Sequence, residues 1–145
     1  MAGARYPANG DQNLTTTRIT ALSVTDNATT AHRGWVYDMY FGNEGTPADL
    51  AGTYLVERCT APGTATAVTP GKVDEQDRAA QAVANENHTV EPTYTANEIM
   101  REVPVNHRGT YRWIAPPGGE LVIPATTTDG FGGNSLHASA TTLFR

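Results

Sequence analysis

Short segments of alternating polar and apolar residues, separated by turn-forming residues, constrain the fold of this 145-residue chain more than any other feature. The clearest is WVYDMYF (35–41), which is expected to place Trp35, Tyr37, Met39 and Phe41 on one face of a strand. A period of two residues is the pattern of a strand with one buried face. Seven segments are predicted to be strands: residues 17–24, 35–41, 53–61, 99–105, 110–115, 120–125 and 137–145.

The spacing of these segments predicts an all-β protein. Turn-forming residues recur at intervals of about 8–15 residues, and many short strands with regular turns are typical of a sandwich. We expect a single-domain β-sandwich, jelly-roll-like or Greek-key-like, over residues 17–145. Residues 1–16 are rich in Gly, Pro, Asn and Asp without periodicity, and they are predicted to form an extended N-terminal arm.

One segment has a different pattern and predicts a short helix in a crossover loop. DEQDRAAQAVANEN (74–87) starts with acidic residues and continues with alanines. Asp74 is suited to cap a helix, and acidic side chains in the first turn interact favourably with the helix dipole.

The stretch YRWIAPPGGELVIPA (111–125) joins two alternating runs through Pro-Pro-Gly-Gly. Prolines cannot donate hydrogen bonds to a sheet, and glycines accept a positive φ. The interpretation is a rigid corner that reverses the strand. It would fix the register of Tyr111 and Trp113 against Leu121 and Ile123.

Charge and hydropathy argue against two classes of partner. The formal net charge is −5 with a single lysine, whereas phosphate recognition needs a basic surface, so no nucleic acid is expected. No run approaches the length of a membrane-spanning helix, and the first residues lack the apolar core of a signal peptide. No membrane partner is therefore expected.

The sequence offers no catalytic, cofactor-binding or metal-binding motif, and an enzyme is not expected. The four histidines lack the spacing of metal ligands and are interpreted as exposed turn residues, with ligation across an oligomer axis as an alternative. Ser135 and His137 lack the strand–turn–helix elbow of a nucleophile. Cys59 is the single cysteine, and we expect it to be a small core residue, with a reactive thiol as the alternative.

The aromatic residues allow two interpretations. Because most of them lie on predicted strands, packing in or near the core is favoured. The remainder could form a carbohydrate-stacking face or a subunit interface, since Tyr and Trp are common at binding hot spots. The residues concerned are Trp35, Tyr37, Tyr40, Tyr54, Tyr94, Tyr111 and Trp113.

The second half of the chain contains AVTP, EPTYTA, V-x-VN-x-R, YRW, APPGGE and VIPAT in this order. This series resembles a run found in small proteins from the structural regions of tailed bacteriophages, although APPGGE here has one proline more. Residues 1–60 match only in strand pattern. The resemblance implies a virion β-sandwich protein similar to head decoration (cement) proteins, which sit as trimers on the capsid and clamp neighbouring capsomers.

The expected function is therefore a structural virion protein, made in the bacterial cytoplasm and located on the outer capsid surface. Its expected partners are the major capsid protein and further copies of itself in a homotrimer. One alternative is a tail, fibre or adhesion module that binds host glycans through exposed aromatics. Another is an isometric-virus coat protein, which the scarcity of basic residues in the arm disfavours. The residues expected to contact partners are Arg5, Tyr6, Leu14, Arg18, His107, Arg108 and Arg145.

Overall fold

The computed structural model describes residues 3–13, 17–26, 32–137 and 143–144, and every regular element among them is a strand. The expected all-β class is therefore confirmed. The strands are β1 (Gln12–Asn13), β2 (Ile19–Asp26), β3 (Gly34–Val36), β4 (Asp38–Phe41), β5 (Asn43–Glu44), β6 (Ala51–Ala61), β7 (Thr64–Val68), β8 (Ala82–Val90), β9 (Thr93–Asn106), β10 (Tyr111–Ile114), β11 (Leu121–Ile123), β12 (Gly130–His137) and β13 (Leu143–Phe144).

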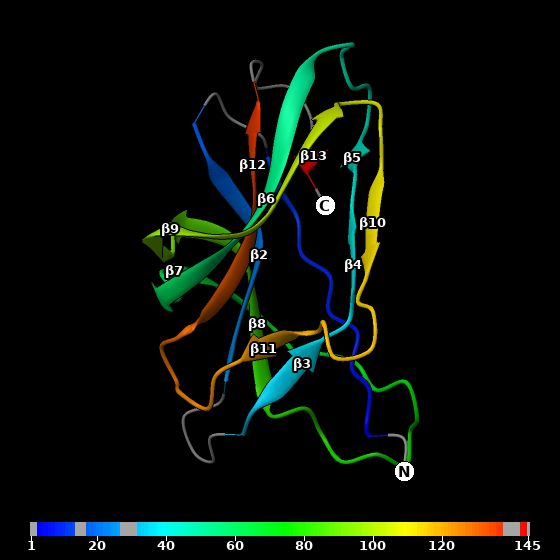
Figure 1. Ribbon diagram of the computed structural model, residues 1–145, viewed down its shortest axis with the longest axis vertical. Coiled ribbons are helices and arrows are strands. Elements are labelled where there is room, and N and C mark those ends of the chain that lie inside the picture. The colour runs from blue at the N-terminus through cyan, green and yellow to red at the C-terminus, as the bar shows by residue number, and fades with distance from the viewer. Residues whose placement is uncertain (1–2, 14–16, 27–31, 138–142, 145) are drawn as a thin grey trace.

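Six strands form one antiparallel sheet in the order β7-β8-β2-β12-β6-β9 (Figure 1). β12 lies near its centre, between β2 and β6. Both faces of the sheet are covered here, because β6 is buried continuously from Tyr54 to Glu57. The packing is close: a Cβ added to Gly132 of β12 would lie 2.2 Å from the Tyr94 hydroxyl oxygen.

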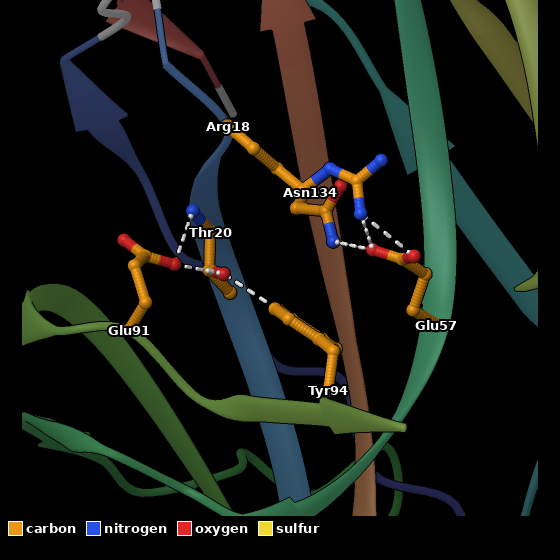
Figure 2. Close-up of polar contacts among 6 residues, drawn as sticks. All are labelled: Arg18, Thr20, Glu57, Glu91, Tyr94 and Asn134. Carbon is orange, nitrogen blue, oxygen red and sulfur yellow. Dashed lines mark hydrogen bonds and ion pairs between the residues drawn. The ribbon is translucent and has the colours of Figure 1, made fainter. Parts of the chain in front are cut away.

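The sheet bends sharply where β6 leads into β7 and β8 leads into β9. β6 continues into β7, and β8 into β9, through two residues each. The two connections are adjacent, because Ala61 pairs with Thr93 before the corner and Thr64 pairs with Val90 after it. Gly63 in the first connection has a φ of +74°, which favours glycine. The start of β9 therefore crosses β2 and β12, as the ribbons of Figures 1 and 2 show.

A bent two-stranded ribbon packs against the main sheet. β4 pairs with β10, and β3 pairs with β11, both antiparallel. The bend lies at Tyr37, between β3 and β4, where the Ala115 amide donates a 2.7 Å hydrogen bond to the Tyr37 carbonyl. Figure 1 shows the β3–β11 ladder turning away from the β4–β10 ladder at this point.

The expected strand reversal at APPGGE is wrong, because β10 and β11 pair with β4 and β3 and not with each other. Residues 115–120 form a loop that leaves the ribbon and returns to it. The Gly119 amide donates to the Pro116 carbonyl at 2.8 Å, and Gly118 has a φ of +79°, the geometry of a type II turn. Type II turns splay their flanking strands, whereas tight hairpins use the mirror-image types.

The hydrophobic core lies between the main sheet and the ribbon. The Phe41 ring of β4 stacks on the Tyr54 ring of β6 with a centroid separation of 5.5 Å. Cys59 is buried as expected, and burial raises the pKa of its thiol to about 11. The buried core cluster consists of Ala21, Phe41, Tyr54, Val56, Trp113, Leu121, Ile123 and Phe131.

The helix expected over residues 74–87 is wrong. The Asp74 carboxylate and carbonyl accept hydrogen bonds from the Gln76 and Asp77 amides, which forms a turn. Aspartate favours such turns for the same reason that it caps helices, because its oxygen accepts from nearby amides. Residues 82–90 are strand β8, which pairs with β7 on one side and β2 on the other. Strand pairing in this position overrides the high helix propensity of the alanines, because tertiary contacts outweigh local propensity.

Candidate functional site

The solvent-facing side of the bent ribbon exposes large apolar side chains. Trp35 is 60% exposed, Tyr40 62% and Ile114 59%, and Tyr37 is also exposed at the bend. Ile114 and Tyr40 are diagonal neighbours on the β4–β10 ladder, because Ile114 pairs with Asp38 and Tyr40 with Arg112. We call these four exposed side chains (Trp35, Tyr37, Tyr40 and Ile114) the aromatic surface.

The bend explains why this surface differs from the expected one. Strict alternation over residues 35–41 would place Trp35 and Tyr37 on the buried side with Phe41. The strand is interrupted at Tyr37, so the alternation shifts there. Phe41 is buried and Met39 packs against the core, whereas Trp35 and Tyr37 are exposed. The expected common face of these four residues is therefore wrong.

An ion pair lies beside two members of the aromatic surface, because Arg112 is paired with Tyr40 and Asp38 with Ile114. Arg112 binds Asp38 through two hydrogen bonds, from Nε at 3.0 Å and from a terminal nitrogen at 2.6 Å. Hydrogen bonding by Arg112 holds the pKa of Asp38 below its ordinary value. Both charges are thus neutralised within the chain. Over residues 33–41 and 111–123 the formal charge is zero, although the whole chain carries −5.

Two of the predicted contact residues lie beside this surface. The Arg5 guanidinium is 5.8 Å from the centroid of the Tyr37 ring, within the range of a cation–π interaction. The neighbouring Tyr6 hydroxyl donates a 2.8 Å hydrogen bond to the carbonyl of Arg78. The described part of the predicted arm is therefore attached to the body of the protein next to Tyr37.

The other predicted contact residues lie elsewhere. His107 is buried in the turn between β9 and β10, and Arg108 in the same turn is exposed and donates from Nε to the Pro47 carbonyl at 3.3 Å. Figure 1 places this turn and the N-terminus at opposite ends of the molecule. Leu14 and Arg145 lie outside the described residues. The described members of the predicted set thus do not form one surface.

Arg18, the remaining predicted residue, belongs to a buried polar cluster shown in Figure 2. Its guanidinium contacts both carboxylate oxygens of Glu57, at 2.8 and 2.9 Å. Asn134 on the adjacent strand β12 donates to the same carboxylate at 2.6 Å. Glu57 is only 4% exposed, so these donors compensate for the removal of its charge from water.

A second group of the same cluster surrounds Thr20, which lies directly opposite Asn134 in the sheet. Glu91 accepts hydrogen bonds from the amide of Thr20, at 3.0 Å, and from its hydroxyl. The Thr20 and Tyr94 hydroxyls are 2.6 Å apart (Figure 2). Burial raises the pKa of Glu91 and that of Tyr94, and hydrogen bonds with Thr20 oppose both shifts.

The structure corrects the expectation for two histidines, because His88 and His107 are buried. The His88 Nε2 and the Ser23 hydroxyl are 3.0 Å apart, and burial lowers the pKa of His88. Ser23 is fully buried, so this pair is part of the sheet packing. Ser135 is also fully buried, and the His137 side chain lies outside the described set. Among the described residues, no three His, Cys, Asp or Glu side chains are grouped as metal ligands would be.

The sequence contains the signal for the aromatic surface, but only in part. In YRWI, alternation separates Tyr111 and Trp113 from Arg112 and Ile114, which correctly predicts opposite faces for the two pairs. The interaction of Arg112 with Asp38 could not be predicted, because it requires the pairing of β10 with β4.

Comparison with known proteins assigns the chain to no class: no family model, no curated protein and no solved structure matches it. No helix among the described residues is long and apolar enough to cross a membrane.

Proposed function

We propose that this chain is a structural protein of a tailed-phage virion, which attaches to the outer surface of the capsid and bridges capsomers as a cement protein. The observation that carries the proposal is the aromatic surface. It combines Trp35, two tyrosines and Ile114 with an arginine that is already paired. Tyr, Trp and Arg are the residue types that dominate protein–protein hot spots.

The charge of this region supports a protein partner. Bringing an unpaired charge into an interface is costly, whereas the Asp38–Arg112 pair has already neutralised both charges. Ile114, at the end of the β4–β10 ladder, offers a partner an apolar contact without a hydrogen-bonding group. The side chains are presented on paired strands, so part of the ordering cost of binding has already been met by folding.

The identity of the partner in this proposal is inferred from the resemblance of the second half of the chain to phage proteins. The major capsid protein would bind the aromatic surface, and three copies would associate around a local three-fold position. A jelly-roll-like or Greek-key-like sandwich, the fold expected for such a protein, is supported by a core that lies between the six-stranded sheet and the ribbon. Attachment at many equivalent positions would strengthen individually modest contacts.

The first experiment is the copy number of this protein in purified virions, measured by quantitative mass spectrometry against the major capsid protein. One copy per capsid subunit, or a simple fraction of it, is expected. A few copies per particle would indicate a tail protein instead. Complete absence from the particle would overturn the proposal of a virion protein.

A second experiment tests the surface itself. Tyr40→Ala is expected to weaken attachment to particles stripped of this protein by about 2 kcal/mol, as hot-spot truncations do. Val90→Ala is the control, because Val90 is 58% exposed on β8 and lies outside the ribbon. Equal binding by both variants would show that the aromatic surface does not bind the capsid.

Glycan binding by a tail or fibre module is the second candidate. It is favoured by the proximity of exposed aromatic rings to the Asp38–Arg112 pair, since rings can stack on sugars while charged groups bind hydroxyls. Binding of host-cell polysaccharide that is lost in Trp35→Ala and Tyr40→Ala would support it over the capsid proposal.

A further inference from the structure

Residues 3–13, which we call the strap, lie in an extended conformation along residues 71–88, which we call the seat. The first half of the strap is held largely through the backbone. The Gly71 amide donates to the Pro7 carbonyl at 2.9 Å, and the Val73 amide donates to the Arg5 carbonyl at 3.1 Å. These bonds depend on the backbone conformation of the strap and on few of its side chains.

The second half of the strap is fitted more closely. The Asp11 amide donates to the Glu86 carboxylate at 3.3 Å, and Gln12 Nε2 donates to the His88 carbonyl at 3.0 Å. Gly10 is buried, and a Cβ at this position would lie 2.6 Å from the Ala21 carbonyl oxygen. The same Cβ would lie 3.1 Å from Glu86 Cβ of the seat, so β2 and the seat together favour a glycine at this point of the strap.

At the start of the strap the charge of Arg5 is complementary to acidic groups of the seat. Arg5 lies over a shallow hollow that it lines together with Asp74 and Asp77 of the seat. The seat thus presents acidic groups to the basic residue of the strap. Such attraction between exposed charges is modest in water and weakens with salt.

The strap buries little apolar surface, which makes its attachment reversible. Among residues 3–9 every side chain is exposed or only half-buried, and Gly10 is the one buried residue of the strap. Segments that are held by exposed hydrogen bonds and bury few apolar groups open at a small free-energy cost. Opening the strap leaves the core cluster intact, because no member of that cluster belongs to residues 3–13.

We infer that the seat binds the strap of a second copy of this chain, so that neighbouring copies exchange straps. The occupant is identified by its surroundings: the seat supplies hydrogen bonds and the acidic hollow, β2 closes the glycine site, and β13 pairs with the end of the strap. An exchanged strap makes the same contacts in the partner as in its own chain, which makes exchange a low-cost route to association. The inference goes beyond the proposed function and does not depend on what binds the aromatic surface.

A disulfide between strap and seat tests the inference. Gly71 and Pro7 are direct neighbours, because the Gly71 amide donates to the Pro7 carbonyl and a Cβ added to Gly71 would lie 3.7 Å from Pro7 Cγ, so we choose these two positions for cysteines. In the double variant Pro7→Cys/Gly71→Cys, an intrachain bridge reports a strap in its own seat. In an equimolar mixture of the two single variants, one carrying a mass tag, a mixed disulfide in excess of random collision forms only if a strap reaches the seat of another chain.

The matched control mixes Pro7→Cys with Val90→Cys, an exposed position outside the seat, and measures accidental collision. We expect the Pro7–Gly71 mixed disulfide to exceed this control several-fold and to increase with protein concentration. The Tyr6→Phe substitution, which removes the hydrogen bond to Arg78, should reduce it. Native Cys59 is buried and does not compete.

Two results would overturn the inference. One is a mixed disulfide no more abundant than the control, together with an efficient intrachain bridge in the double variant. The other is the absence of both bridges, which would show that the strap does not occupy the seat. Neither result affects the capsid-attachment assay of Tyr40→Ala, so failure of the strap exchange and failure of the proposed function are separate outcomes.

Discussion

Arg18 and Glu57 form a two-pronged ion pair in which one partner is almost fully buried while the other remains partly exposed to water. The Arg18 side chain is 42% exposed, and that of Glu57 only 5%. The arrangement places a carboxylate inside an all-β protein and neutralises it from the surface. The buried cluster around it yields several predictions that depend on these contacts and not on the partner of the protein.

Removing Arg18 should destabilise the protein because Glu57 would lose its neutralising partner. Arg18→Ala is expected to lower the free energy of unfolding by about 2–3 kcal/mol, less than for a fully buried pair because water reaches the arginine. Urea denaturation of the wild type, both single variants and the double variant with Glu57→Gln measures the coupling. In the Glu57→Gln background the cost of Arg18→Ala should be much smaller. An equal cost in both backgrounds would mean that the pair contributes nothing.

Stability should depend on the ionisation of Glu91. Burial raises the pKa of Glu91 in the folded protein, so the folded state binds this proton more tightly than the unfolded chain does. The stabilising contribution is complete below the unfolded pKa of about 4.3 and is lost as the pH rises through the folded pKa. Glu91→Gln keeps an acceptor for the Thr20 amide but cannot ionise. The unfolding free energy of the variant relative to wild type should therefore increase from pH 4 to pH 7.

The pH profile of Glu91→Gln must be compared with that of the wild type, because His88 also changes the stability with pH. Burial lowers the pKa of His88, so its contribution has the opposite sign: it is present above the unfolded pKa and is lost as the pH falls through the folded pKa. The pH profile of the wild type contains both groups and that of Glu91→Gln contains only His88, so the difference between the two profiles isolates Glu91. Parallel profiles would show that Glu91 ionises equally in the folded and unfolded states.

The two tryptophans should differ sharply in their effect on stability. Trp113 is 8% exposed in the core, with the Arg101 guanidinium 5.1 Å from its ring centroid, whereas Trp35 is exposed. Trp113→Ala is expected to cost about 3–5 kcal/mol, as core truncations do. Trp35→Ala should cost no more than about 0.5 kcal/mol, as is usual for surface substitutions. Chemical denaturation of both variants distinguishes them, and similar costs would contradict the assignment of Trp35 to the surface.

Gly132 should be sensitive to a single methyl group. Because its Cβ would lie 2.2 Å from the Tyr94 hydroxyl oxygen, Gly132→Ala must displace Tyr94 and is expected to cost about 1–3 kcal/mol. Tyr94→Phe removes the nearest clashing atom, so the same substitution should cost less in that background. A double-mutant cycle measured by thermal or urea unfolding gives the coupling. Purely additive changes in unfolding free energy would show that the cost of Gly132→Ala does not arise from contact with the Tyr94 hydroxyl.

The strand content could be predicted from the sequence because alternation is a local property. Segments 17–24, 53–61 and 99–105 all fall largely within strands of the structure. The helix and the strand reversal were wrong for a related reason. Aspartate followed by alanines, and Pro-Pro-Gly-Gly, both specify local backbone geometry without specifying a partner, and the pairing of β8 with β2 and of β10 with β4 decided the outcome.

The site was less predictable than the fold. The aromatic residues were recognised as candidates for a binding face, but which of them are exposed depends on the interruption at Tyr37. The buried cluster joins Arg18, Glu57 and Asn134 across many intervening residues. Individually these residues resemble ordinary surface positions, so only the register of β2, β12 and β6 brings them together.

The loop at residues 115–120 should tolerate insertions and deletions. Its ends are held by the two ladders of the ribbon, while the loop itself pairs with no strand. An added or lost residue here leaves every cross-strand partner in place, whereas the same change within β10 would move Trp113 from the core side to the solvent side. A peptide tag placed at Pro116–Gly119 should therefore be tolerated by the fold.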